Sequence, residues 1–484
     1  MEQRRPRWVD KPEFDWTPQP PLPIEPPTSP WDTKEPVIIG FAQRAPEFAP
    51  ANDTVPPSLP DRVSRALVRA FDQLVAHAWQ LCRHPGQAAG RLALPAIAPR
   101  LAIGLGQGLL LSLLIFARDA GSGSKIILAG LIMAATFAPL ALVQGLGRIA
   151  LRPLLLWTGL AAIGLAGLGT YHAWRITGAD PGHTGLWLAA MVTGFLFIGQ
   201  ALLLAHARSA PLRYAVLYES SWRLVMETLL CGLIALCAWT LCKFSAHLFA
   251  SQASLPRAFA IPLMTLCLAA ASELRAGTLL HLMKRSAVIV FAFLLPPLIF
   301  FATVIILFGA LSRWQPPLTL CGLQGLLLVI GINASYRGGG EWRPLWRRRA
   351  EFVAAFLLPP LALLDALALH ARIAQYGFTG PRVVATALML LFCTYALAYA
   401  GAALISLGGG RWMARIERAN LTMAFVIMSL FATLASPLGD PVRLAVANQN
   451  WRMLHGRVAP ETFDYAYLRQ SGLRFGRAVL EGPR

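Results

Sequence analysis

Apolar runs of helical length alternate with short polar gaps from residue 101 to residue 437. Eleven runs are candidate membrane spans, at Leu101–Ala117, Ile126–Leu146, Pro153–Tyr171, Gly185–Ala205, Leu224–Cys242, Ala258–Ala271, Ala287–Leu311, Pro317–Gly331, Phe352–His370, Val383–Leu407 and Leu421–Ala435. A helix rises about 1.5 Å per residue, so about 20 residues cross roughly 30 Å of hydrocarbon. The pattern predicts an all-α, polytopic transmembrane helix bundle of about 11 spans over residues 101–437.

Two different patterns precede this bundle. Residues 1–60 hold 15 of the 36 prolines and slightly more acidic than basic residues, which predicts a disordered tail with polyproline II character. Within residues 61–100, Asp61–Cys82 has the periodicity of an amphipathic helix with arginines on its polar face. Such a helix lies on the membrane surface or packs on cytoplasmic loops, and the pattern favours neither.

The last segment, residues 438–484, is polar enough to lie in water. Asp440 followed by Pro441 is typical of a helix start. The first helix predicted here has one apolar face, formed by Leu444, Ala447, Trp451 and Leu454. A second helix opens at Pro460, with Phe463 and Tyr467 directed inward. We expect a small helical hairpin folded back on the ends of the spans.

Composition supports a membrane protein and narrows its partners. The chain is 56% hydrophobic and 14% charged, against roughly 25% charged residues in soluble domains. The net charge of +19 lies mostly in short gaps between apolar runs, which favours anionic lipid headgroups over nucleic acid. The densest basic group, Arg347, Arg348 and Arg349, is the predicted headgroup contact.

The distribution of basic residues predicts an orientation. With the N-terminus in the cytosol, the inner gaps carry 16 Lys and Arg residues and the outer gaps carry 8. This bias follows the positive-inside rule. It places the segment after residue 437 outside, on the periplasmic side of a bacterial inner membrane.

One short motif recurs inside the apolar region. The sequence Ala-Phe-Leu-Leu-Pro-Pro-Leu occupies residues 292–298 and again residues 355–361. A proline pair removes two amide donors and kinks a helix. Two interpretations stay open: a pair of broken helices that line a path, or two kinked helices that only pack.

A polar interruption, Leu369–Arg382, separates two long apolar runs and contains a Tyr-Gly turn. Asp365 lies in the preceding span about two helical turns before Arg372, hence on the same face. A carboxylate at mid-membrane costs about 2.5–3.5 kcal/mol on insertion scales, so it needs a partner, a proton or water. The candidate polar site at the outer end comprises Asp365, Arg372, Tyr376, Thr379 and Arg382. Asp365 is either part of a proton or substrate relay or a structural residue near the outer interface, protonated or hydrogen-bonded; the pattern favours neither.

Two stretches carry a resemblance to a known family. The first is Arg372–Arg382, and the second comprises Asp440–Arg443, Asn448, Gly456-Arg457, Phe463-Asp464 and Leu468-Arg469. Together with Trp222–Phe249, they resemble the bacterial family called "domain of unknown function 4153". The resemblance covers roughly residues 101–484 and leaves out the proline-rich tail. It implies a bacterial integral membrane protein and supplies no activity, cofactor or catalytic residue.

No familiar catalytic motif is present. The chain lacks His-Glu-x-x-His, P-loop and Gly-x-Ser-x-Gly sequences, and its seven cysteines form no Cys-x-x-Cys pair. We therefore predict no catalytic residues, no metal site and no cofactor. The favoured function is a transporter or permease with a polar site on its outer side. The alternative is a non-enzymatic envelope scaffold or assembly factor that recruits a protein partner through the N-terminal tail. A third hypothesis, an enzyme that acts on lipid-linked substrates, has less support because no catalytic motif is present.

Overall fold

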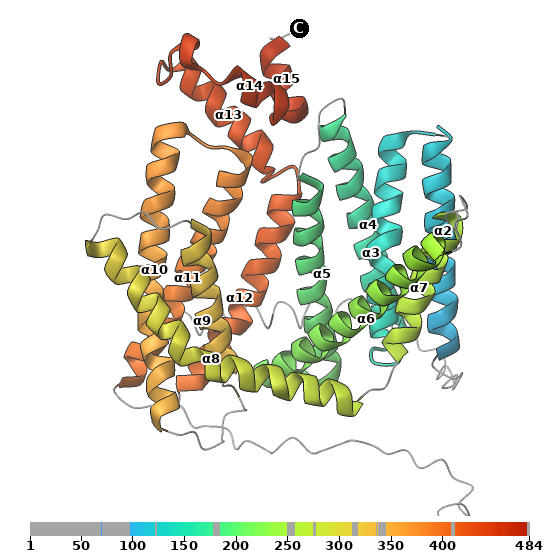
Figure 1. Cartoon of the computed structure of the whole chain (residues 1–484), viewed down its shortest axis with the longest axis horizontal. Coiled ribbons are helices and arrows are strands. Elements are labelled where there is room, and N and C mark those ends of the chain that lie inside the picture. Colours follow the sequence, from blue (N-terminus) through green and yellow to red (C-terminus); the bar gives the residue numbers. More distant parts are fainter. Residues whose placement is uncertain are drawn as a thin grey trace, which may run out of the picture. The chain divides into compact units, whose positions relative to one another are not determined.

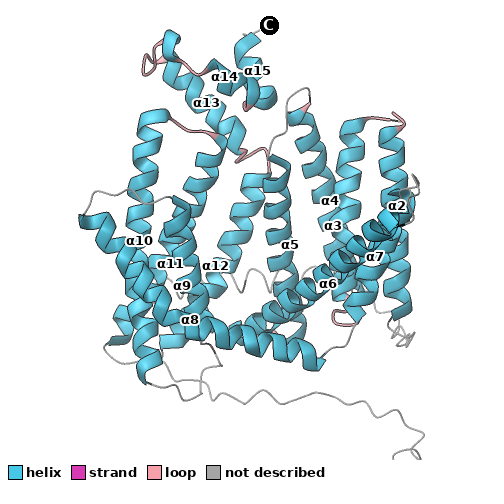
Figure 2. Cartoon of the chain, viewed as in Figure 1, coloured by secondary structure: helices cyan, strands magenta, loops and turns pink. Residues whose placement is uncertain are grey.

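The computed structural model describes Arg69 and residues 97–121, 123–177, 184–248, 257–273, 277–311, 318–334, 336, 345–407 and 412–481. These residues form helices joined by turns, and none of them lies in a strand (Figure 2). The all-α prediction is confirmed for this part of the chain. The predicted tail, residues 1–60, and the predicted amphipathic helix, apart from Arg69, lie outside the described residues.

Each of the eleven predicted spans corresponds to a helix of its own, and only Leu146 and Pro317 of these spans lie one residue outside its bounds (Figure 1). These helices are α2 (Ile97–Asp119), α3 (Lys125–Gly145), α4 (Leu151–Ile176), α5 (Thr184–Arg208), α6 (Tyr214–Leu248), α7 (Arg257–Glu273), α8 (Gly277–Leu311), α9 (Leu318–Ala334), α10 (Leu345–Tyr376), α11 (Gly380–Leu407) and α12 (Trp412–Ala435). Among the described residues, eight helices are long and apolar enough to cross a membrane: α2, α3, α4, α5, α8, α10, α11 and α12. The chain is thus a multi-pass membrane protein, while the count of eleven spans is not confirmed.

Three helices, α6, α7 and α9, account for the difference between the eleven predicted spans and these eight helices. α7 and α9 have 17 residues each, about 25 Å of helix, which is short for a full crossing. α6 is 35 residues long and begins ten residues before the predicted span, with charged residues in its first turns. In Figure 1, α6 and the first part of α8 run obliquely to α3, α4 and α5.

Apolar side chains cover the outside of the bundle. Phe116, Ile163, Phe293 and Leu397, from four different helices, are each largely exposed. An apolar surface of this extent is unfavourable in water and matches the hydrocarbon of a bilayer. The inside is held by several apolar clusters, of which the largest joins α8, α9, α10, α11 and α12.

The repeated proline pairs lie inside continuous helices. α8 includes Pro296 and Pro297, and α10 includes Pro359 and Pro360, without a break at either pair. The equivalent residues Leu295 and Leu358 are both fully buried in the same apolar cluster. Of the two interpretations, the continuous helices and the shared burial favour the one in which the motif packs neighbouring helices.

Two arginines bind one carboxylate on α6. The Arg223 Nε donates to Glu227 Oε1 at 2.9 Å, the contact typical of residues four apart in a helix. Arg148, in the turn between α3 and α4, donates to both oxygens of Glu227 at 2.6 and 2.8 Å. This bidentate pair holds α6 against that turn.

The chain ends in what we call the C-terminal module, Pro441–Glu481. It consists of α13 (Pro441–Leu454), a 3-10 turn (Pro460–Thr462), α14 (Tyr465–Gln470) and α15 (Leu473–Glu481), so three short α-helices replace the predicted hairpin. The predicted apolar face of α13 points outward, with Leu454 70% exposed. The opposite face of α13 is buried instead, because Val442 and Val446 pack with Phe463, Leu468 and Leu473 in the core of the module.

Candidate ligand site beneath the C-terminal module

Five long helices meet the module at one end of the bundle, which we call the module end. α4, α10 and α12 finish there, and α5 and α11 begin there (Figure 1). α13 packs on α11, and α15 packs on the end of α4. This arrangement brings residues from opposite ends of the sequence around one space.

The turn between α10 and α11 is hydrogen-bonded to the module. The backbone N–H of Phe378 donates to Asn448 Oδ1 at 3.1 Å, and the Gln449 amide donates to the carbonyl of Phe378 at 2.8 Å. Gly377 has a φ of +72°, which favours glycine, and a Cβ at this position would collide with Arg452. The turn sequence and the module therefore fit each other closely.

Asp440 connects the module to α4. Its fully buried carboxylate accepts hydrogen bonds from Tyr171 Oη at 2.7 Å and Arg175 Nη1 at 2.8 Å. The other oxygen accepts from the backbone N–H groups of Val442 and Arg443, so Asp440 is the N-cap of α13, as predicted. Arg175 is only 7% exposed and also contacts His172 Nδ1 at 3.0–3.2 Å. Both charges are thus removed from solvent and satisfied by each other.

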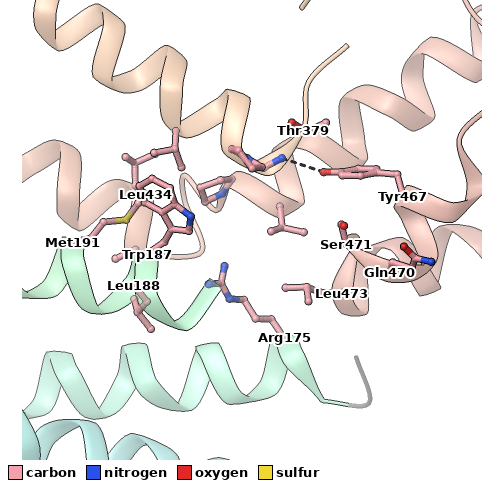
Figure 3. A pocket seen from close by; sticks show the side chains of 16 residues that line it. Arg175, Trp187, Leu188, Met191, Thr379, Leu434, Tyr467, Gln470, Ser471 and Leu473 are labelled. Atoms are coloured by element: carbon pink, nitrogen blue, oxygen red, sulfur yellow. Dashed lines mark hydrogen bonds between the residues drawn. The ribbon is translucent and has the colours of Figure 1, made fainter. Parts of the chain in front are cut away.

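A cavity of about 490 Å³ lies between the module and the helix ends (Figure 3). Its walls are mainly apolar and include Trp187, Leu188, Met191, Val384, Leu434, Val442 and Leu473. A few polar side chains face the same space, namely Arg175, Thr379, Tyr467, Gln470 and Ser471. Cavities of this size, with an apolar lining and a few polar groups, are typical of small-molecule sites.

Tyr467 supplies a hydrogen-bond donor at the edge of this cavity. Its hydroxyl oxygen accepts a hydrogen bond from the backbone N–H of Gly380 at 3.1 Å, so the hydroxyl proton remains available to another acceptor (Figure 3). Burial raises the pKa of the Tyr467 hydroxyl, and the Gly380 N–H and Arg382 oppose this only in part. The group therefore stays protonated throughout the physiological pH range.

The predicted polar residues do not form one site. Thr379 lines the cavity. Arg382 lies beside it, donating to the carbonyl of Gly377 at 2.8 Å, with its guanidinium 5.3 Å from the Tyr376 ring centroid. Arg372 is exposed and makes no ion pair with Asp365.

Asp365 stands apart from the other four. It is 6% exposed and packed against α9 and α11, close enough to Cys321 and Cys393 to interact with both electrostatically. It makes no hydrogen bond or ion pair with any residue that the structure describes, and its Oδ1 is completely buried. The expected Asp365–Arg372 pairing is absent because the two side chains face different surroundings.

The predicted headgroup residues lie within a helix rather than in a loop. Arg347, Arg348 and Arg349 occupy the first turns of α10, at the end away from the module. Arg348 and Arg349 are exposed, and the Arg348 guanidinium lies 5.8 Å from the Phe352 ring centroid. Their position is compatible with contact to lipid phosphates, which stays a prediction.

Hydrogen bonds join four helices at the end of the bundle opposite the module. We call this group the Asn–Tyr network; it contains Tyr214 of α6, Asn333 of α9, Tyr399 of α11 and Asn420 of α12. Tyr399 donates to Asn420 Oδ1 at 2.7 Å and accepts from Asn333 Nδ2 at 2.7 Å. The Asn420 amide also donates to Asn333 Oδ1 at 2.6 Å and to Tyr214 Oη at 2.9 Å. The buried polar groups are therefore satisfied by one another, which holds these helix ends together.

Several cavity residues escaped sequence reasoning. Arg175 and Trp187 were treated only as parts of an outer gap and a span, and Ser471 was not singled out. One signal could have paired Arg175 with Asp440. Arg175 is a basic residue in the last turn of an apolar helix, and Asp440 is a single carboxylate just after the last span. The metal prediction is not tested, although the described ranges contain no cluster of three or more His, Cys, Asp or Glu side chains suited to a metal ion.

Comparisons with family models, with curated proteins and with solved structures gave no match for this chain. The resemblance to the family of unknown function therefore stays a prediction. The two stretches that carry it are nevertheless in contact, since Phe378 is bonded to Asn448 and Gly380 to Tyr467. The resembling residues thus describe one structural unit, the turn after α10 together with the module that covers it.

Proposed function

We propose that the protein is a permease-like transporter of the bacterial inner membrane, and that the cavity beneath the C-terminal module is its outward-facing binding site. The observation that carries this proposal is the cavity itself, about 490 Å³ within a multi-pass helical bundle. Its apolar walls and few polar groups suit a small amphipathic molecule, with an acceptor placed near Tyr467 and the apolar part against Trp187 and Met191.

The opposite end of the same helices supports a transporter. α11 and α12 line the cavity at the module end and are joined away from it by the Asn–Tyr network. A carrier that works by alternating access has its site open to one side while the other side is closed. The cavity and the network are the two features expected of such a protein in an outward-facing state.

Chain direction supports placing the module outside. α4, α10 and α12 all finish at the module end. α10 therefore begins at the opposite end, and a chain that has crossed in α8 must return before α10. α9 is the helix available for that return. If α9 crosses, and α6 and α7 either both cross or both do not, the number of crossings is odd. An odd number would put the C-terminal module on the side opposite the start of α2, which agrees with the charge distribution.

A pair of tryptophan substitutions tests the binding site. Ser471, the C-cap of α14, lines the cavity, and Ser471→Trp is designed to obstruct it. Arg469→Trp places the same side chain at an exposed position within α14 that does not line the cavity. With the protein in lipid nanodiscs, anilinonaphthalene sulfonate should show saturable binding to the wild type and Arg469→Trp, and none to Ser471→Trp. Equal binding to all three proteins would contradict a ligand site in this cavity.

The same pair separates transport from scaffolding. Cells that produce the wild type, Ser471→Trp or Arg469→Trp are compared with cells that lack the protein, and small molecules in the growth medium are measured by mass spectrometry. We expect at least one compound to change with the wild type and Arg469→Trp only. A medium that is identical in all four cultures would contradict transport and favour the scaffold, for which the described residues supply no specific observation.

A further inference from the structure

We propose that Asp365 is a proton-binding site inside the membrane, protonated while α10 is packed against α9 and α11 and deprotonated when this contact opens to water. The site lies in a different place from the ligand cavity. It does not depend on that cavity binding anything, and it requires no partner molecule other than the proton.

The position of Asp365 is the first argument. It is the twenty-first residue of a 32-residue helix that is long and apolar enough to cross a membrane. It lies five residues before His370, where the apolar run ends, and eleven before the end of α10 at Tyr376, about 8 and 16 Å along the helix axis. An aspartate side chain is too short to cover either distance, so Asp365 cannot be solvated as a long lysine or arginine side chain can be.

The surroundings of the carboxyl group are the second argument. α8, α9 and α11 pack against α10. α8 has no titratable residue after Arg285, α9 contributes only Cys321, and α11 contributes Cys393 near Asp365 and three others, Arg382, Tyr395 and Tyr399, along its length. None of these groups forms a hydrogen bond or ion pair with Asp365.

The energetic consequence follows from burial without a partner. An isolated carboxylate in an apolar environment is so unfavourable that the group takes up a proton instead. Asp440 provides the contrast in the same protein, because its buried carboxylate accepts hydrogen bonds from Arg175, Tyr171 and two backbone N–H groups. Asp365 has no such donors, so a proton is what makes its burial tolerable.

Proton binding at Asp365 also links helix packing to pH. The closed contact between α9, α10 and α11 binds one proton more than an opened, hydrated contact. By linkage, raising the pH above the value at which a hydrated aspartate loses its proton favours opening. The equilibrium constant between the opened and the closed contact then rises by up to about tenfold per pH unit for a single proton. Lowering the pH favours the closed arrangement.

The protonation state is tested with the full chain in lipid nanodiscs. Dicyclohexylcarbodiimide adds to protonated carboxyl groups in apolar surroundings, and the modified peptides are identified by mass spectrometry. We expect modification at Asp365 and none at Asp440. In parallel, the infrared carbonyl band of a protonated carboxylic acid should be present at neutral pH and absent in Asp365→Asn. An unmodified Asp365 together with a missing band would overturn the proposal.

The link to packing is tested with native thiols. Cys321 on α9 is fully buried beside Asp365, whereas Cys237 on α6 is exposed, so labelling at Cys237 serves as the reference in each sample. The ratio of N-ethylmaleimide labelling at Cys321 to that at Cys237 should rise at least tenfold between mildly acidic and alkaline pH in the wild type. It should stay constant in Asp365→Asn, which keeps the shape but cannot ionise. The same rise in both proteins would overturn the linkage to Asp365.

Discussion

Replacing Asp440 by Asn measures how the C-terminal module is held on the bundle. The Asp440 carboxylate is fully buried and lies 2.8 Å from Arg175 Nη1. Asn keeps an oxygen for the first amides of α13 but leaves the guanidinium of Arg175, 7% exposed, without a counterion. Removing one partner of a buried ion pair costs about 3–5 kcal/mol. We therefore expect the free energy of opening the module to fall by about that amount.

Hydrogen exchange at the backbone amides of α13 is the suitable assay, because it reports local opening. About 1.4 kcal/mol corresponds to a tenfold change, so α13 amides should exchange roughly 150- to 5,000-fold faster in Asp440→Asn. Asp440→Ala also removes the N-cap oxygen, worth about 1 kcal/mol, and should exchange faster again by about fivefold. Amides in the middle of α5 serve as the internal reference and should be unchanged.

A second substitution provides the control. Arg175→Gln combined with Asp440→Asn replaces the ion pair by two neutral amides and should restore most of the protection of α13, because no unpaired charge remains. The reasoning is refuted if Asp440→Asn exchanges within about threefold of the wild type, since a buried unpaired charge must shift opening by far more than that.

Three further results are expected. Tyr399→Phe removes a hydroxyl that bridges two amides of the Asn–Tyr network and should lower the free energy of unfolding by about 1–3 kcal/mol, measured by thermal denaturation. The control, Tyr395→Phe, should cause no loss, because the Tyr395 hydroxyl makes no hydrogen bond within the described residues. Gly377→Ala should cost about 2–3 kcal/mol, because in addition to backbone strain it displaces the Gln449 amide from its hydrogen bonds to the carbonyls of Tyr376 and Phe378. Gly121→Ala, with the same φ of +72° and open space around it, should cost only about 1 kcal/mol, and equal Tm losses would argue against the displacement. Deleting residues 1–60 should leave substrate flux unchanged and abolish only partner capture by the tail, so lost flux in a normally folded deletion would assign the tail to transport.

Hydropathy located the eleven long helices because each apolar run must hydrogen-bond its own backbone in lipid, which only a helix does locally. It did not give their lengths. α6 and α10 begin before the predicted spans, at Tyr214 and Leu345, since a helix that continues past the hydrocarbon carries charged residues and resembles a loop in a hydropathy profile. The same effect assigned Arg347 and its neighbours to a loop.

The face of α13 was misread for a different reason. Leu444 and Leu454 have helical spacing, but Val442 and Val446 have it as well, so α13 carries apolar residues on two sides. The choice between them depends on where the following chain returns, and no local pattern contains that information. Periodicity identifies a helix here without identifying its buried side.

The candidate site was predictable only in part. Thr379 was found because it lies in a polar interruption, and Asp440 was found as a helix N-cap from its proline neighbour. The contact of Asp440 with Arg175 spans 265 residues and has no signature at either position alone. Asp365 was recognised as costly in lipid, but Arg372 lies about 10 Å further along the same face of α10, where the neighbouring helices no longer bury it. Spacing along one helix does not show where that cover by its neighbours ends.

The long separation between Arg175 and Asp440 affects how the protein is made. α4 enters the membrane when Asp440 has not yet been synthesised, and 265 further residues must be translated before the partner exists. At about 5–20 residues per second, this takes roughly 13–50 s. Throughout that interval the guanidinium of Arg175 must be hydrated at the membrane surface or shielded by a helper protein. A ribosome that stops before the codon for Asp440 therefore leaves a membrane-inserted chain with an unmatched positive charge, a feature suited to recognition by quality-control proteases.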